Sequence, residues 1–144
     1  MNPWPQERIL IEQILSLKGS QSRLSWVVER TRRLPRLPVT ERIDTNRVEG
    51  CLSKLWFQGS LFQGRCVFAC DSDSLVVKGV GTLVCESCSG RLPGEIVERR
   101  NDPPLLTDPL GMALTQNRRS GLQKLWERIV AFAEAHATDS IANP

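Results

Sequence analysis

The feature that most constrains the fold of this 144-residue chain is a hairpin-like segment that lies between helical segments. Residues 53–57 are apolar and aromatic, residues 59–64 (GSLFQG) are bracketed by glycines, and residues 65–70 alternate in polarity. This pattern predicts two antiparallel strands joined by a loop over residues 59–64. With helices before and after it, the chain is expected to be an α+β domain, a small antiparallel sheet packed with helices.

The helical segments are identified by apolar side chains that recur every three or four residues. Helices are predicted from Pro5 to about residue 17 and over residues 24–34, with an exposed loop over residues 35–46. Residues 71–84 fit either a strand or a helix, and the stripe of valines favours a helix. A short helix follows over residues 93–98, then a proline-rich loop over residues 101–109 and a long amphipathic helix over residues 117–137. We expect a single domain, residues 1–144, with an ordered core over about 8–137 and short flexible tails.

Composition narrows the class of protein. Apolar residues make up 40 % and charged residues 24 % of the chain, which is ordinary for a soluble globular protein. No run approaches about 18 apolar residues and no secretory signal is visible, which leaves a cytosolic or plastid-like reducing compartment as the default. We therefore predict a cytoplasmic protein without a membrane partner. The net charge of +3 is too small for a typical nucleic-acid binder. A basic cluster at Arg30, Arg32, Arg33 and Arg36 fits either a solvated face or a contact with an acidic partner.

Cys51 is the candidate functional residue. It follows Gly50 and precedes the first predicted strand, so it sits at a loop-to-strand junction where a thiol can be presented to another molecule. A thiolate attacks sulfur, and a free thiol with a pKa near ~8.5 is only partly ionised at neutral pH unless neighbours help. Taken alone, the residues leave two interpretations open: a sulfur-handling nucleophile, or an ordinary half-buried cysteine.

Four motifs decide between these interpretations because they occur in the order found in one family. They are RLP (residues 33–35), VEGCLSKLW (48–56), CDSDSLVVKG (70–79) and LTQNRRSGL (114–122). Together they resemble the SufE/CsdE family of sulfur acceptor proteins, over about residues 8–137. The resemblance implies an α+β fold similar to that of IscU-type scaffolds. It also implies that the protein is a sulfur carrier and not a self-contained enzyme. Its partner would be a pyridoxal-phosphate cysteine desulfurase of the SufS/CsdA type, which the protein would stimulate by accepting sulfur on Cys51. The carrier would then deliver this sulfur to an iron–sulfur scaffold protein.

The same resemblance indicates two further site residues. The family motif places an arginine just before the Ser/Gly of the last helix, and Arg118 matches it better than Arg119 does. Near the N-terminus of that helix, Arg118 is expected either to stabilise a thiolate or contact the desulfurase, or to be an ordinary surface arginine. Asp73 matches the Ser-Asp pair, and we expect it to cap the following helix near Cys51. No cofactor-binding motif is present in the sequence.

The other four cysteines raise the alternative of a zinc protein or an IscU-like cluster scaffold. Cys66 and Cys70, four apart on a strand, would lie about 13 Å from each other, too far for one zinc ion or a disulfide. Cys85 and Cys88 have a spacing suited to a metal or a redox pair, but no second pair completes a site. We therefore expect all four to be buried or half-buried packing thiols and predict no metal site. A third interpretation, an interaction module with an inert Cys51, is also open.

Overall fold

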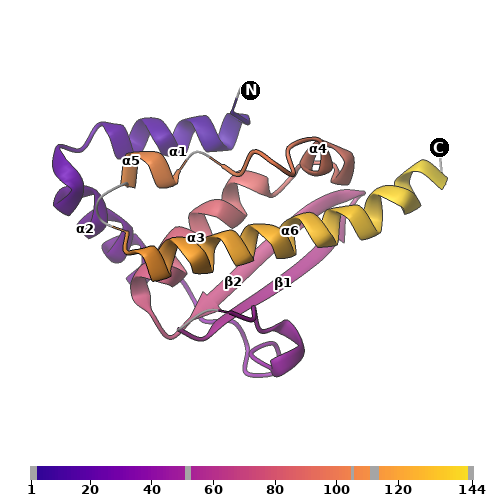
Figure 1. Cartoon of the computed structure of the whole chain (residues 1–144), viewed down its shortest axis with the longest axis horizontal. Coiled ribbons are helices and arrows are strands. Elements are labelled where there is room, and N and C mark those ends of the chain that lie inside the picture. Colours follow the sequence, from indigo (N-terminus) through magenta and orange to yellow (C-terminus); the bar gives the residue numbers. More distant parts are fainter. Residues whose placement is uncertain (1–2, 51–52, 105, 111–113, 143–144) are drawn as a thin grey trace.

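The computed structural model describes residues 3–50, 53–104, 106–110 and 114–142 (Figure 1). Its elements follow the chain in the order helices, hairpin, helices. The bounds are α1 Pro5–Leu15, α2 Gly19–Arg32, the 3-10 turn η1 Asp44–Asn46, β1 Leu55–Phe62, β2 Arg65–Ser72, α3 Leu75–Cys88, α4 Pro93–Glu98, α5 Thr107–Leu110 and α6 Gln116–Ala142. The predicted α+β class is confirmed.

The sheet consists of β1 and β2, paired antiparallel from Leu55 opposite Ser72 to Phe62 opposite Arg65. The predicted loop over residues 59–64 is wrong, because β1 continues to Phe62 and the turn has only two residues. Gln63 and Gly64 both have positive φ, 52° and 77°. This is the backbone of a type I′ hairpin turn, whose twist matches that of the strands.

Gly59 therefore lies inside a strand, where it serves packing. A Cβ atom at this position would lie 2.7 Å from the Phe132 ring of α6. The missing side chain lets α6 approach β1 closely, and Figure 1 shows α6 running along the hairpin. Gly59, the first glycine of GSLFQG, is therefore explained by a contact between a helix and a strand and not by a turn.

α3 is the central helix, since ten of its fourteen residues are buried and it contacts β2, α1, α2 and α6. Its two glycines explain the ambiguous pattern of residues 71–84. A Cβ atom at Gly79 would collide with Thr31 and Val27 of α2, and one at Gly81 would lie 2.9 Å from the Cys70 sulfur. Gly79 therefore lets α3 lie close to α2, and Gly81 lets it lie close to β2. Neither glycine ends the helix, which continues to Cys88.

Several boundaries differ from the sequence-based expectations. η1 and α5 are short helical turns within segments that were predicted to be loops. α6 continues to Ala142, five residues past its expected end at residue 137. Among the residues the structure describes, no helix is both long enough and apolar enough to cross a bilayer.

A buried ion pair joins the beginning of the chain to the end of α4. Arg99 donates to both carboxylate oxygens of Glu7, at 2.6 and 3.2 Å, and its guanidinium lies 4.0 Å from the centre of the Trp4 ring. The Glu7 carboxylate also accepts a hydrogen bond from the backbone N–H group of Trp4 at 3.0 Å. The two charges can be buried because each is paired and hydrogen-bonded.

Candidate functional site

The segment that carries Cys51 is a short loop whose two ends are held together. The Val48 N–H group donates to the Leu55 carbonyl at 2.8 Å, and Arg47 forms a β-bridge with Trp56. Six residues, 49–54, lie between these closing residues. Cys51 itself falls outside the described residues, so its expected exposure stays a prediction. Chain connectivity places it within a loop that starts from a fixed base.

The C-terminal end of this loop is braced against the end of β2. The Lys54 N–H group donates to the Asp73 carboxylate at 3.0 Å, and the Ser72 hydroxyl donates to the Lys54 carbonyl at 2.5 Å. The Asp73 N–H group donates to the same carbonyl at 3.3 Å. These three hydrogen bonds fix Lys54, which lies three positions after Cys51 and immediately precedes β1.

Asp73 thus supports the cysteine loop in a way that the sequence did not suggest. We expected it to cap the following helix, but the cap of α3 is Ser74, whose hydroxyl accepts from the Val77 N–H group at 3.3 Å. Asp73 is exposed and precedes the cap. Its carboxylate accepts a hydrogen bond from the Lys54 N–H group instead, and its predicted place beside the Cys51 thiol stays a prediction.

On the N-terminal side of the loop, Gly50 meets a side chain of α6. Gly50 has a φ of 86°, a conformation that favours glycine, and a Cβ atom there would lie 3.4 Å from Lys124 Cε. The aliphatic part of Lys124 therefore packs over the residue that precedes Cys51. Lys124 also lines a surface cavity of about 320 Å³ together with Val48, Glu49, Glu127 and Arg128.

Lys124 is a residue that the sequence analysis missed. Its ammonium group lies 3.6 Å from the Glu127 carboxylate, one turn further along α6. In the sequence this pair is indistinguishable from an ordinary exposed helix pair, because the contact with Gly50 joins residues far apart in the chain. Only the path of α6 across the loop reveals it.

Arg118 lies in the first turn of α6. The Thr115 hydroxyl accepts from the Arg118 N–H group at 3.3 Å, as an N-capping side chain does. The residue is half-buried, and its guanidinium pairs with no carboxylate in the described ranges. Arg118 is six residues before Lys124, about 9 Å along the helix axis and about 120° around it. Its predicted role at the thiol stays a prediction.

Asp71 organises the backbone next to this site. Its buried carboxylate accepts from the Leu37 N–H group at 3.0 Å and from Arg36 at 3.2 Å, and it lies 3.4 Å from the Lys78 ammonium. Burial by itself raises the pKa of this carboxyl. The hydrogen bonds and the nearby positive charge outweigh burial, so the pKa lies below its usual value.

The remaining cysteines, Cys66, Cys70, Cys85 and Cys88, are free and buried, so their predicted burial is confirmed. Burial raises the pKa of the Cys66 thiol to about 11 and also raises the pKa of Cys88. A hydrogen bond with Cys70, together with burial, raises the pKa of Cys85 well above its usual value. Protonated thiols are poor nucleophiles and poor metal ligands. Within the described ranges, no three His, Cys, Asp or Glu residues converge as a metal site would require.

The fold and the site together define an α+β protein that carries a cysteine on a short, braced loop. The family model described as "SufE: Fe-S metabolism associated domain" matches residues 8–133. The chain therefore belongs to the SufE family, which is associated with iron–sulfur metabolism, and the predicted family is confirmed.

The relatives of this chain include a SufE-like protein and parts of longer enzymes. An uncharacterised SufE-like protein of Rhizobium meliloti is 28 % identical over 131 residues, which cover 87 % of this chain and 92 % of that protein. The chloroplastic quinolinate synthase of Arabidopsis thaliana is 32 % identical over 101 residues, 69 % of this chain. This match spans only 14 % of the Arabidopsis enzyme's length. A separate match to the chloroplastic quinolinate synthase of rice spans 18 % of that enzyme's length.

A solved structure shows the same fold. The solution structure of a hypothetical protein from Thermus thermophilus superposes with a TM-score of 0.73. The alignment covers 96 % of this chain and 99 % of that one, at 22 % sequence identity.

Proposed function

We propose that this protein is a sulfur carrier that accepts persulfide sulfur on Cys51 from a cysteine desulfurase and passes it on for iron–sulfur cluster assembly. The observation that carries the proposal is the loop over residues 49–54, closed by the Val48–Leu55 hydrogen bond and braced by Asp73. A carrier needs its thiol on a segment that can enter another protein's active site without disturbing its own fold. A six-residue loop on a fixed base meets that need.

The transfer balances as a thiol–persulfide exchange. The Cys51 thiolate attacks the terminal sulfur of the donor's cysteine persulfide, a new S–S bond forms, and the donor's S–S bond breaks. The donor cysteine leaves as a thiolate and takes up a proton. No oxidant is required, because the sulfane sulfur is passed on at the same oxidation level. The acceptor stimulates the donor by freeing its cysteine for the next cycle.

Three other thiols of the described chain support this assignment by contrast. Cys66, Cys85 and Cys88 are buried and have raised pKa values, so their thiolates are disfavoured. A carrier needs a thiol that ionises and reaches a partner. Free thiols throughout this part of the chain also fit a reducing compartment, and we propose the cytoplasm.

The proposal is tested by desulfurase turnover. A purified SufS/CsdA-type cysteine desulfurase is assayed for alanine formation from cysteine with and without this protein. We expect the wild-type chain to raise the turnover and Cys51→Ala to abolish the stimulation. Cys66→Ala, the same chemical change at a buried thiol, is the matched control and should retain it. Equal stimulation by the wild type and Cys51→Ala would refute the proposal.

A further inference from the structure

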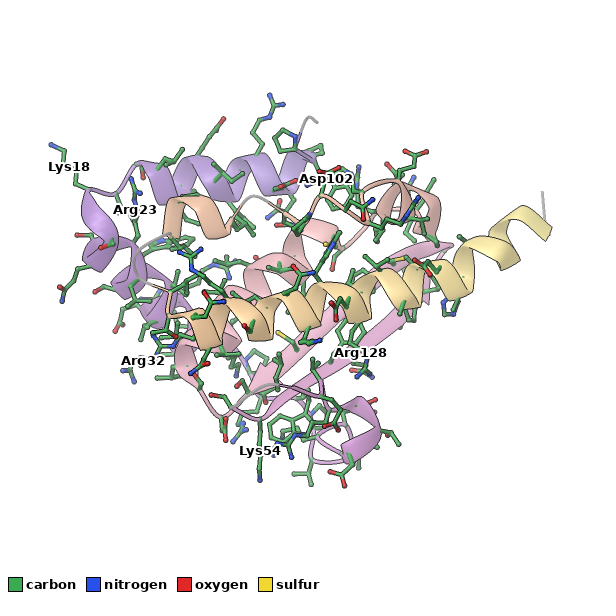
Figure 2. All side chains as sticks on the ribbon, in the orientation of Figure 1. Lys18, Arg23, Arg32, Lys54, Asp102 and Arg128 are labelled. Atoms are coloured by element: carbon green, nitrogen blue, oxygen red, sulfur yellow. The ribbon has the colours of Figure 1, made fainter. Side chains whose placement is uncertain are left out.

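A second cavity lies on the flank of α6 that faces away from the cysteine loop. It has a volume of about 190 Å³ and is formed by the beginning of α6, by α3 and by the prolines that follow α4. In Figure 2, Asp102, which precedes Pro103 of the lining, lies above the α6 ribbon, whereas Lys54 and Arg128 lie below it. The described lining includes no residue of the segment 49–54, so this cavity is separate from the proposed sulfur-carrying site.

The buried part of the lining is apolar. It consists of Val84, Pro104, Leu122 and Trp126. The indole N–H group of Trp126 donates to the Arg100 carbonyl at 3.0 Å, so its one donor is already used. Proline has no backbone N–H group to offer. The interior of the cavity therefore suits an apolar group and not a polar one.

The exposed part of the lining supplies hydrogen-bond donors and a positive charge. It consists of Pro103, Arg119 and Gln123. The Nε–H group of Arg119 donates to the Leu114 carbonyl at 3.3 Å, which ties this side chain to the beginning of α6. A guanidinium is always charged and has several N–H donors, so an arginine that binds a carbonyl can also bind a carboxylate. The described lining contains no acidic residue, so the cavity favours an anion over a cation.

The size and position of the cavity limit the ligand further. Drug-sized ligands fill cavities of about 300–1,000 Å³, so a cavity of about 190 Å³ admits only a smaller molecule. The cavity also lies beside the first turns of α6, a helix of 27 residues. The N-terminal end of a helix carries a partial positive charge, which adds to the attraction for an anion.

We propose that this cavity binds a small monocarboxylic acid, with its apolar body against Leu122 and Trp126 and its carboxylate at Arg119 and Gln123. The apolar interior, the donors at the surface and the positive charge together define this chemistry. Carboxylates bound by a guanidinium form strong, charge-assisted hydrogen bonds. The site goes beyond the sulfur-carrier function proposed above and does not depend on it.

The test uses phenylacetate as the probe and phenylacetamide, which has the same shape and no charge, as its matched control. Binding to the isotopically labelled full chain is followed by NMR, through the indole N–H signal of Trp126 and the side-chain amide signals of Gln123. We expect saturable shifts of these signals with a dissociation constant on the order of 1 mM for phenylacetate. Phenylacetamide should bind about tenfold more weakly, because it lacks the charge-assisted bond.

A pair of variants assigns the charge effect to one residue. Arg119→Met removes the charge and keeps an unbranched side chain, so phenylacetate should bind about tenfold more weakly. Arg65→Met, the same change at an exposed arginine of the hairpin, should alter the affinity by less than about twofold. Equal effects of the two variants would overturn the role given to Arg119.

Other outcomes would overturn the site itself. They are the absence of saturable shifts at Trp126 and Gln123, and equal affinities for phenylacetate and phenylacetamide in the unaltered protein. Tighter binding of a short peptide that ends in phenylalanine would assign the cavity to a protein C-terminus and contradict its assignment to a free small acid. Because the titration does not involve Cys51, its failure would leave the proposed sulfur transfer unaffected.

Discussion

At the scale of single residues, the cysteine loop depends on carboxylates at the end of β2 that have different roles. Asp71 is buried and holds Arg36, Leu37 and Lys78, whereas Asp73 is exposed and holds only the backbone of Lys54. The motif CDSDSLVVKG contains both, and nothing in its local pattern separates them. Burial and partners, which depend on segments distant in sequence, make the distinction.

Replacing Asp71 by asparagine should destabilise the protein strongly. The change leaves the buried Lys78 ammonium without its counter-charge, and breaking a buried pair in this way costs about 3–5 kcal/mol. The free energy of unfolding is obtained from urea denaturation. Asp73→Asn, the same change two residues later on the exposed side, should cost less than about 1 kcal/mol. Similar losses in the two variants would contradict the role given to Asp71.

The raised pKa of Cys66 predicts a loss of stability at alkaline pH. In the unfolded chain this thiol ionises around its usual pKa of 9.0, whereas in the folded protein it stays protonated until about 11. Its contribution is therefore complete below pH 9 and disappears as the pH rises towards 11. Each pH unit in this window removes at most about 1.4 kcal/mol.

Urea denaturation between about pH 8 and pH 11 checks this expectation. Cys66→Ala should lose less stability over this window than the wild type, because one of the buried thiols no longer titrates. The packing lost with the sulfur is independent of pH and lowers the whole curve equally. Parallel curves for the two proteins would show that Cys66 does not titrate as described.

At the scale of secondary structure, the sequence predicted the order of the main elements but not the contacts between them. The stripes of apolar residues identified the helices, and the glycines at 79 and 81 left a real ambiguity. The same holds for Gly59, which resembles a turn residue when only its neighbours are considered. In all three cases the glycine is explained by a close approach from another element, and local patterns carry no information about that.

Gly59→Ala tests the contact between β1 and α6. The new methyl group would lie 2.7 Å from the Phe132 ring, so α6 must shift, and such overpacking costs about 1–3 kcal/mol. Gly94→Ala in α4 is the matched control, because a Cβ atom there meets nothing within 4 Å. That variant should be unchanged or up to about 1 kcal/mol more stable. Thermal unfolding of both variants decides whether Gly59 is a packing residue or a neutral one.

At the scale of the whole molecule, the end of β2 and the middle of α6, which lie far apart in the sequence, meet at the loop that carries Cys51. The motifs of the sequence pointed to Cys51, Asp73 and Arg118, and to the SufE family that the comparisons confirm. They could not identify Lys124 or the hydrogen bond between Lys54 and Asp73, because these depend on how α6 and the end of β2 lie against the loop in space.

The central claim is that Cys51 carries sulfur, and direct mapping of the persulfide tests it. The wild-type protein is incubated with a cysteine desulfurase and isotopically labelled cysteine, thiols are blocked, and peptides are analysed by mass spectrometry. The account predicts one added labelled sulfur atom on the peptide that contains Cys51 and none on Cys66, Cys70, Cys85 or Cys88. Label on any of those four, with Cys51 unmodified, would contradict it.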